Sequence, residues 1–205
     1  MRSPGKVIRV HFPRDRSAKW RELAVAVAVL FGAMRRAPDP RDFDGWVSQL
    51  AVSSCRQRAR IHLLTSGSAA VPALRRGLAH RTPIVRQQCV RIFDQLVDDA
   101  SLPELVLALD DADPVVGARA LHALACDRCK QNECRPGEDL WVPRALELLR
   151  SPNPDLRAAS IDALGKVVSR RPDVAAALLD VAESERNKGL RCMARRYALL
   201  TQLAR

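Results

Sequence analysis

Asn153-Pro154-Asp155-Leu156-Arg157 is the stretch that decides the fold, because it is the clearest copy of a turn that recurs along the chain. Related turns are Asp113-Pro114-Val115-Val116-Gly117 and Thr82-Pro83-Ile84-Val85-Arg86. Proline suits the first turn of a helix, because its missing N–H would lack a partner there in any case. Asp113 and Asn153 are good N-cap residues directly before it. Each of these turns therefore predicts the start of a helix.

Two weaker copies extend the pattern in both directions, namely Ser53-Ser54-Cys55-Arg56 and Lys188-Gly189-Leu190-Arg191. The equivalent positions are then 56, 86, 117, 157 and 191, at intervals of 30, 31, 40 and 34 residues. Three residues after each of these positions the side chain is small: Ala59, Cys89, Ala120, Ser160 and Ala194. Small residues let neighbouring helices approach closely, and periods of this length predict stacked helix pairs.

The pattern resembles HEAT repeats, in the short form that is also called PBS-lyase HEAT-like repeats, over roughly residues 45–205. The resemblance implies an all-α, right-handed α-solenoid of about four to five helix pairs, with the second helices on the concave side. At position 117 glycine replaces the arginine of the family pattern. The resemblance does not imply a single function, because such folds have many.

The predicted domain organisation has three parts. Residues 1–16 are a basic N-terminal arm, ordered or disordered, and residues 17–44 are a capping helix with its linker. The solenoid follows over residues 45–205, with a cysteine loop inserted at 126–139. A solenoid needs a cap over its exposed end, and we expect a helix over residues 17–36 to be that cap.

The net charge is +11, and it is distributed unevenly. Residues 1–66 have 13 basic and 5 acidic side chains, a net charge of +8, whereas residues 67–205 have 21 and 18, a net charge of +3. A basic segment attracts nucleic acid, anionic lipid or an acidic protein. The alternative interpretation of the N-terminal third is a solvated basic tail.

The longest apolar run, residues 23–34, is too short to span a bilayer. Arg35 and Arg36 follow it without a cleavage site of small residues, so we interpret the run as a buried helix and not as an export signal. The expected location is therefore the cytoplasm, where thiols stay reduced. The six cysteines then suggest metal binding or core packing before disulfides.

The interval of 40 residues contains an insertion that begins with Cys126-Asp127-Arg128-Cys129 and ends after Cys134. His122 lies four residues before Cys126 and shares a helix face with it. The candidate metal ligands are His122, Cys126, Cys129 and Cys134, a set suited to tetrahedral zinc. An iron–sulfur cluster is the weaker metal candidate, because it usually needs four cysteines. Three reduced thiols without a metal, or a redox dithiol at Cys126 and Cys129, would also explain the loop.

Arginines of the second helices are candidates for groove binding: Arg119, Arg195 and Arg196. An arginine-lined groove would suit phosphates or an acidic partner. For the turn arginines Arg86, Arg157 and Arg191 we instead predict ion pairs with acids of adjacent repeats, such as Asp113 and Asp155.

The sequence contains no nucleophile motif, phosphate loop or H-E-x-x-H zinc motif. We therefore predict a non-catalytic protein-interaction scaffold with a metal-binding cysteine loop. The alternative is nucleic-acid binding through the basic N-terminal third, in the manner of HEAT-like alkylpurine DNA glycosylases. Those enzymes use groove tryptophans, whereas Trp46 and Trp141 fall in predicted first helices, Trp141 at the start of its helix. Bilin lyases are a second enzyme class that the resemblance leaves open.

Overall fold

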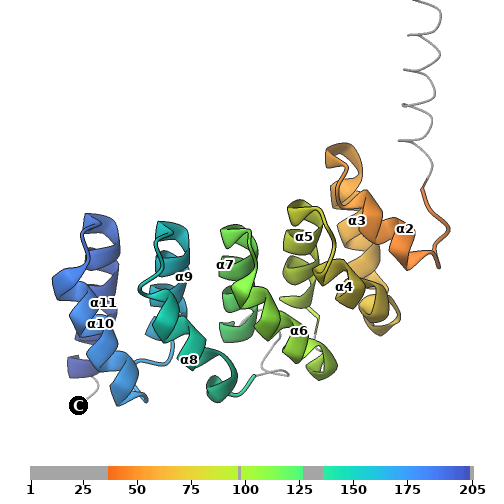
Figure 1. The fold of residues 1–205 in the computed structure, drawn as a ribbon. Helices are drawn as coiled ribbons and strands as arrows, with labels where there is room; N and C mark the ends of the chain where they lie inside the picture. Colours follow the sequence, from red (N-terminus) through yellow and green to blue (C-terminus); the bar gives the residue numbers. More distant parts are fainter. Residues whose placement is uncertain (1–36, 97, 127–135, 204–205) are drawn as a thin grey trace, which may run out of the picture. The chain divides into compact units, whose positions relative to one another are not determined.

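The computed structural model describes residues 37–96, 98–126 and 136–203 (Figure 1). Residues 38–205 form one compact unit, and the fold described here is the fold of that unit. Over the described residues the chain has ten α-helices, three short 3-10 helices and no strand. The prediction of an all-α fold is therefore confirmed. The predicted N-terminal arm and the capping helix at 17–36 lie outside the described residues.

The ten α-helices form five pairs that follow one another in chain order (Figure 1). The pairs are α2 (Phe43–Gln49) with α3 (Ser53–Thr65), α4 (Val71–Leu78) with α5 (Pro83–Phe93), α6 (Leu102–Leu107) with α7 (Pro114–Ala125), α8 (Glu138–Leu148) with α9 (Pro154–Gly165), and α10 (Pro172–Ser184) with α11 (Lys188–Leu203). The short 3-10 helices are η1 (Gly67–Ala70), η2 (Asp99–Ser101) and η3 (Ala108–Asp110). This arrangement confirms the predicted solenoid of four to five helix pairs.

The second helices of successive pairs pack against one another in a continuous row, α3–α5–α7–α9–α11. The small residues predicted to allow this close approach all have an exposed fraction of 0%: Ala59, Cys89, Ala120, Ser160 and Ala194. The first helices carry the larger aromatic side chains, since Trp46 on α2 and Trp141 on α8 are both buried. The core therefore lies between the two helices of each pair and along the row of second helices.

The predicted helix starts are confirmed at the proline turns, because α5, α7 and α9 begin at Pro83, Pro114 and Pro154. The N-cap side chains of Asp113 and Asn153 accept hydrogen bonds from backbone N–H groups of the first turn. The predicted start of the helix after the insertion was wrong by three residues, since α8 begins at Glu138 and not at Trp141. Acidic residues in a first turn favour a helix there, and Glu138 and Asp139 supply them.

A second capping contact recurs at four of the turns. In each, the side chain of the residue two positions before the N-cap accepts a hydrogen bond from the N–H of the N-cap residue. The four contacts are Thr82 N–H to His80 Nδ1 at 3.0 Å, Asp113 N–H to Asp111 Oδ1 at 2.8 Å, Asn153 N–H to Ser151 Oγ at 3.2 Å and Asn187 N–H to Glu185 Oε1 at 2.8 Å. Each contact satisfies a backbone donor that the helix itself leaves unpaired.

Four turn arginines each donate a hydrogen bond to the backbone carbonyl six residues before them. The contacts are Arg56 to Leu50 O at 2.8 Å, Arg86 to His80 O at 2.9 Å, Arg157 to Ser151 O at 2.9 Å and Arg191 to Glu185 O at 2.8 Å. The arginine therefore connects the start of the second helix to the turn before it. The third pair lacks this contact, because its equivalent residue is Gly117.

The turn arginines Arg86 and Arg157 do form ion pairs with acids of the next repeat, but the predicted partners Asp113 and Asp155 were wrong. Arg86 pairs with Asp111 through two contacts of 2.6 Å. Arg157 pairs with Glu185 through contacts of 2.8 and 3.2 Å. The partner is the acid two residues before the N-cap, because the N-cap carboxylate of Asp113 faces its own helix.

Gly117 departs from the arginine pattern, and it lies at a closely packed position. A Cβ atom built at this position would lie 3.0 Å from the carbonyl oxygen of Leu109 and 3.2 Å from a methyl carbon of Leu156. Arg86 and Arg157 each pair with an acid that lies two residues before the next N-cap. For position 117 the equivalent residue is Ser151, which is not an acid. The missing arginine therefore leaves no acid without its partner at that turn.

We predict that Leu164→Ala destabilises the protein by about 2–5 kcal/mol, the usual range for a fully buried leucine. Leu164 on α9 has an exposed fraction of 0%. Urea unfolding followed by circular dichroism measures the loss. The control is Leu107→Ala on α6, where the side chain is 72% exposed and the loss should stay below about 0.5 kcal/mol. Equal losses in the two variants would contradict the packing described here.

We also predict a pH-dependent contribution from Glu185. Hydrogen bonds from Arg157 and from the Asn187 N–H lower the pKa of this carboxyl below its ordinary value, and burial opposes the shift. Because the pKa is lower in the folded state, the ionised carboxylate increases the free energy of unfolding. This contribution is fully present above the pKa of the unfolded state, which is about 4.3. This stability is lost as the pH falls through the folded pKa.

The measurement compares urea unfolding of the wild type with that of Glu185→Gln between pH 7 and pH 2.5. The difference in unfolding free energy should be constant above about pH 5 and should shrink at lower pH. Glu183→Gln, which changes an exposed carboxylate two residues earlier, in the last turn of α10, is the control. A difference for Glu185→Gln that does not change with pH would contradict the prediction.

Candidate functional site

A groove crosses three successive second helices and is the strongest candidate for a functional site. Its volume is about 510 Å3. It lies between the C-terminal end of α5, one face of α7 and the first turn of α9. The lining residues are Arg91, Asp94, Val115, Ala118, Arg119, His122 and Asp155. Because it crosses three pairs, this groove exists only through the stacking of repeats.

The groove has an apolar floor and a charged border. Val115 is 37% exposed although it is apolar. Arg91 is exposed, and Arg119 has a buried Nε atom that has no hydrogen-bond partner among the described residues. Asp155, in the first turn of α9, is also exposed. The groove therefore presents both signs of charge around apolar contact area, as protein-binding surfaces commonly do.

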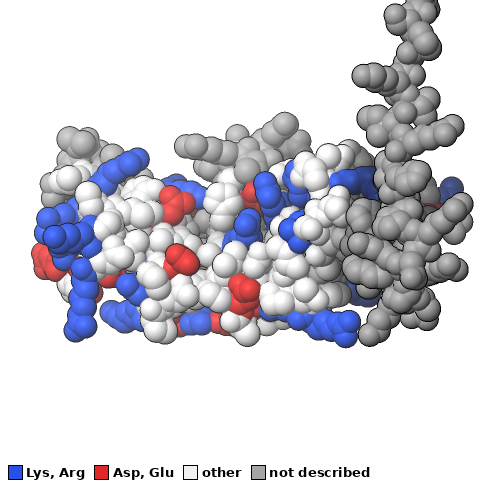
Figure 2. Space-filling model, turned by 90° about the horizontal axis from the view of Figure 1, so that it is seen from above, with Lys and Arg blue, Asp and Glu red and all other residues white. Residues whose placement is uncertain are grey.

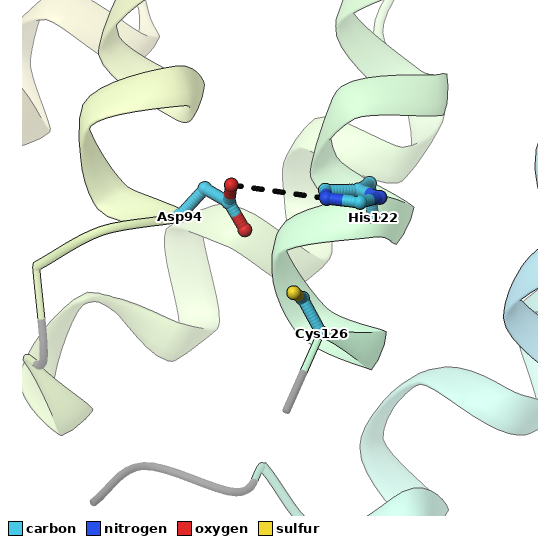
Figure 3. Close-up of side chains that lie close together, drawn as sticks. All are labelled: Asp94, His122 and Cys126. Carbon is cyan, nitrogen blue, oxygen red and sulfur yellow. Dashed lines mark ion pairs between the residues drawn. The ribbon is translucent and has the colours of Figure 1, made fainter. Parts of the chain in front are cut away.

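At one end of the groove Asp94, His122 and Cys126 converge (Figure 3). One potential ligand atom from each residue lies within 4.8 Å of the other two. His122 Nε2 is 3.8 Å from Asp94 Oδ2, and the two side chains are 51% and 14% exposed. Cys126 is buried, and Asp94 Oδ1 is buried without a hydrogen-bond partner among the described residues.

The local structure explains why these three side chains meet. His122 lies in the last turn of α7 and Cys126 is its C-cap, so their spacing of four places them on one helix face. Asp94 is the C-cap of α5, and α5 packs directly against α7. The cluster therefore joins the second helix of one repeat to the second helix of the next.

Of the predicted metal ligands, the structure brings His122 and Cys126 together, whereas Cys129 and Cys134 lie outside the described residues. Sequence reasoning missed Asp94, because it precedes His122 by 28 residues and belongs to another repeat. The aligned repeats contain the signal that could have found it. The equivalent residues are Leu64, Asp94, Ala125, Gly165 and Leu199, and only Asp94 is polar.

The predicted groove arginines do not share one site. Arg119 lines the groove. Arg195 and Arg196 lie on α11 in the last pair, where the Nε of Arg195 donates to the carbonyl of Ala182 at 3.2 Å. Lys and Arg side chains gather over this last pair, at the left of Figure 2. Arg186, Lys188, Arg195 and Arg196 are exposed there.

A second pocket of about 470 Å3 adjoins the place where the chain enters and leaves the insertion. Cys126, Pro136, Trp141, Lys166 and Arg170 are among its lining residues. Arg170 pairs with Glu138 at 2.5 Å, which connects the start of α8 with the segment after α9. Cys126 thus borders this pocket and also belongs to the cluster at the end of the groove.

Comparisons with known proteins support the repeat prediction. The family model described as HEAT repeats matches residues 102–198. Among solved structures, the chain is similar to a chain in the complex of CpcE and CpcF of phycocyanin lyase from Nostoc sp. PCC7120. The TM-score is 0.63 at 18% sequence identity, and the match covers 80% of this chain and 99% of that chain. This likeness shows a shared fold. No curated protein sequence matches the chain.

No helix among the described residues combines the length and the apolar character of a membrane span.

The tryptophans that a groove-type DNA glycosylase would use, Trp46 and Trp141, are buried in first helices. These two tryptophans therefore do not line the groove and do not support a glycosylase-type site.

The cysteines generate a prediction of their own. Burial raises the pKa of the Cys89 thiol to about 12, so this residue stays protonated at neutral pH. Only the thiolate reacts with alkylating agents. We expect iodoacetamide at pH 8 to modify the exposed Cys192 within minutes and to leave Cys89 unmodified until the protein unfolds. Peptide mass spectrometry measures both, and equal rates for the two cysteines in the folded protein would contradict the assignment of Cys89 to the core.

Proposed function

We propose that this row of stacked helix pairs is a scaffold that binds a protein partner along its second helices. The observation that carries the proposal is the groove between α5, α7 and α9. The similar fold of a chain from a two-protein complex, CpcE with CpcF, supports a role in protein assembly. The partner would lie across at least three repeats.

The groove is suited to a partner because its walls are already in place. The second helices contact one another through fully buried small residues, so they cannot shift much without losing contact. Binding to a preformed surface costs less ordering entropy than binding to a mobile one. The apolar floor at Val115 and Ala118 would supply burial, and the charged border would set the orientation of the partner.

The charges of the groove point to a partner segment with mixed charge. Arg91 and Arg119 offer guanidinium groups to carboxylates, and Asp155 offers an acceptor to a basic side chain. A nucleic-acid strand would meet Asp94 and Asp155 as repulsive groups. For this reason a protein segment fits the groove better than a phosphate backbone.

An enzymatic role is the second candidate, because the structurally similar chain belongs to a phycocyanin lyase complex. A lyase of this kind would use the same groove to hold its protein substrate. The non-catalytic role and the cytoplasmic location remain predictions of the sequence. The participation of Cys129 and Cys134 in a zinc site is likewise still a prediction.

The test is capture of the partner by the purified chain, followed by measurement of its affinity. Val115→Asp places a charge on the groove floor and should weaken binding by at least about tenfold, equal to about 1.4 kcal/mol. Leu107→Asp is the matched control, because it also places a charge on an exposed apolar residue but on a first helix.

The expected result is a partner held by the wild type and by Leu107→Asp and lost by Val115→Asp. Equal affinity in both variants would place the partner elsewhere on the molecule. Tight binding to random DNA that falls steeply with salt would favour the nucleic-acid alternative. Turnover of a bilin-bearing protein would favour the lyase.

A further inference from the structure

We propose that Asp94, His122 and Cys126 bind one transition-metal ion, with zinc as the best fit. The site goes beyond the proposed scaffold function, because it connects two successive repeats whether or not a partner is bound. Asp94 comes from the C-terminal end of α5, and the other two ligands come from the C-terminal end of α7 (Figure 3). Its three ligands all lie in the described part of the chain.

The distances fit a metal site that closes by a small movement. Zinc bonds of about 2.0–2.3 Å in a tetrahedron place the ligand atoms roughly 3.3–3.6 Å apart. His122 Nε2 and Asp94 Oδ2 are 3.8 Å apart, which is close to that spacing. All three ligand atoms lie within 4.8 Å of one another. Closure therefore needs side-chain shifts on the order of 1 Å, and no backbone rearrangement.

The kinds of ligand atom decide which metals are suitable. A thiolate and an imidazole favour zinc and related transition metals, whereas magnesium and calcium require oxygen ligands. A carboxylate is also a regular zinc ligand. Three protein ligands leave one coordination position open, and His122 is half exposed, so water can reach that position.

Asp94 carries a second, independent sign of a missing partner. Its Oδ1 atom is buried and accepts no hydrogen bond among the described residues. A buried carboxylate oxygen without a partner is costly, because it has lost its hydration. The ion pair with His122 is too long for a hydrogen bond and uses the other oxygen. A bound cation would compensate the buried charge.

The neighbouring charges limit the affinity of the site without abolishing it. Arg91 and Arg119 line the same groove and oppose a cation, whereas Asp155 favours it. Deprotonated Asp94 and Cys126 would together contribute two negative charges to a divalent ion. The complex of ion and ligands is then neutral, which makes a partly buried position acceptable.

The structural consequence of the site is a connection between the second and third pairs. Asp94 and His122 lie on different repeats, and repeats are otherwise held together by packing and by ion pairs such as that of Arg86 with Asp111. A metal that binds the folded state and not the unfolded chain raises stability. We therefore expect zinc to raise the melting temperature of the metal-free protein.

The experiment uses the full chain without a histidine tag, stripped of metal and titrated with Co2+ and then Zn2+. Co2+ should produce a visible absorption together with a near-ultraviolet thiolate-to-metal band, and Zn2+ should displace it at one equivalent. Asp94→Asn, His122→Gln and Cys126→Ser should each weaken Zn2+ binding by more than about 100-fold. Removing a residue that only hydrogen-bonds to a metal ligand costs about 10- to 100-fold, so a larger loss identifies a direct ligand.

The controls are Asp155→Asn, an acid of the same groove outside the cluster, and Cys192→Ser, an exposed cysteine on α11. Both should bind Zn2+ like the wild type. His122 is half exposed, so His122→Gln should fold normally even if Cys126→Ser does not, and circular dichroism checks both. Unchanged Zn2+ affinity in Asp94→Asn and His122→Gln would overturn the site and assign any bound metal to other thiols. A cobalt spectrum without the thiolate band would also overturn it.

Discussion

The turn before each second helix is the constraint on which the rest of the structure depends. The first N–H groups of a helix have no partner inside it, so each turn must supply acceptors. Here one side chain caps the N–H of the N-cap residue, and the turn arginine holds the carbonyl six residues before itself. Both contacts fix the direction in which the second helix leaves the turn. Because at least one of these two contacts occurs at each of the five turns, successive second helices leave in the same direction and can stack.

Stacking then depends on size at one position of each second helix. A small residue there is fully buried in every described pair, which lets the backbones approach. The surface that results is continuous over several repeats, and the groove between α5, α7 and α9 is part of it. A single pair could not form this groove. The candidate binding surface is therefore a property of the stack and not of any one repeat.

The third pair departs from the pattern in several ways that occur close together. Gly117 stands where the other four turns have arginine, and a Cβ atom at this position would contact the Leu109 backbone closely. The same helix ends at Cys126, where the insertion begins. His122 and Cys126 face Asp94 of the pair before. Regular helix packing continues on either side of this irregular region.

Much of the architecture follows from the sequence by itself, because turn chemistry and helix spacing are local. The proline turns, the helix starts at Pro83, Pro114 and Pro154, and the small contact positions all follow from residues within a few positions of one another. Local spacing also placed His122 and Cys126 on one helix face. These inferences need only the geometry of a single helix or turn.

Contacts between repeats were decided by the tertiary structure. The acids that pair with Arg86 and Arg157 are Asp111 and Glu185, and which acid reaches the arginine depends on how one turn lies over the next. Asp94 joined the cluster for the same reason, since 28 residues separate it from His122 along the chain. Sequence spacing reports neighbours along a helix, whereas neighbours across repeats are set by the packing distance and rotation between helix pairs.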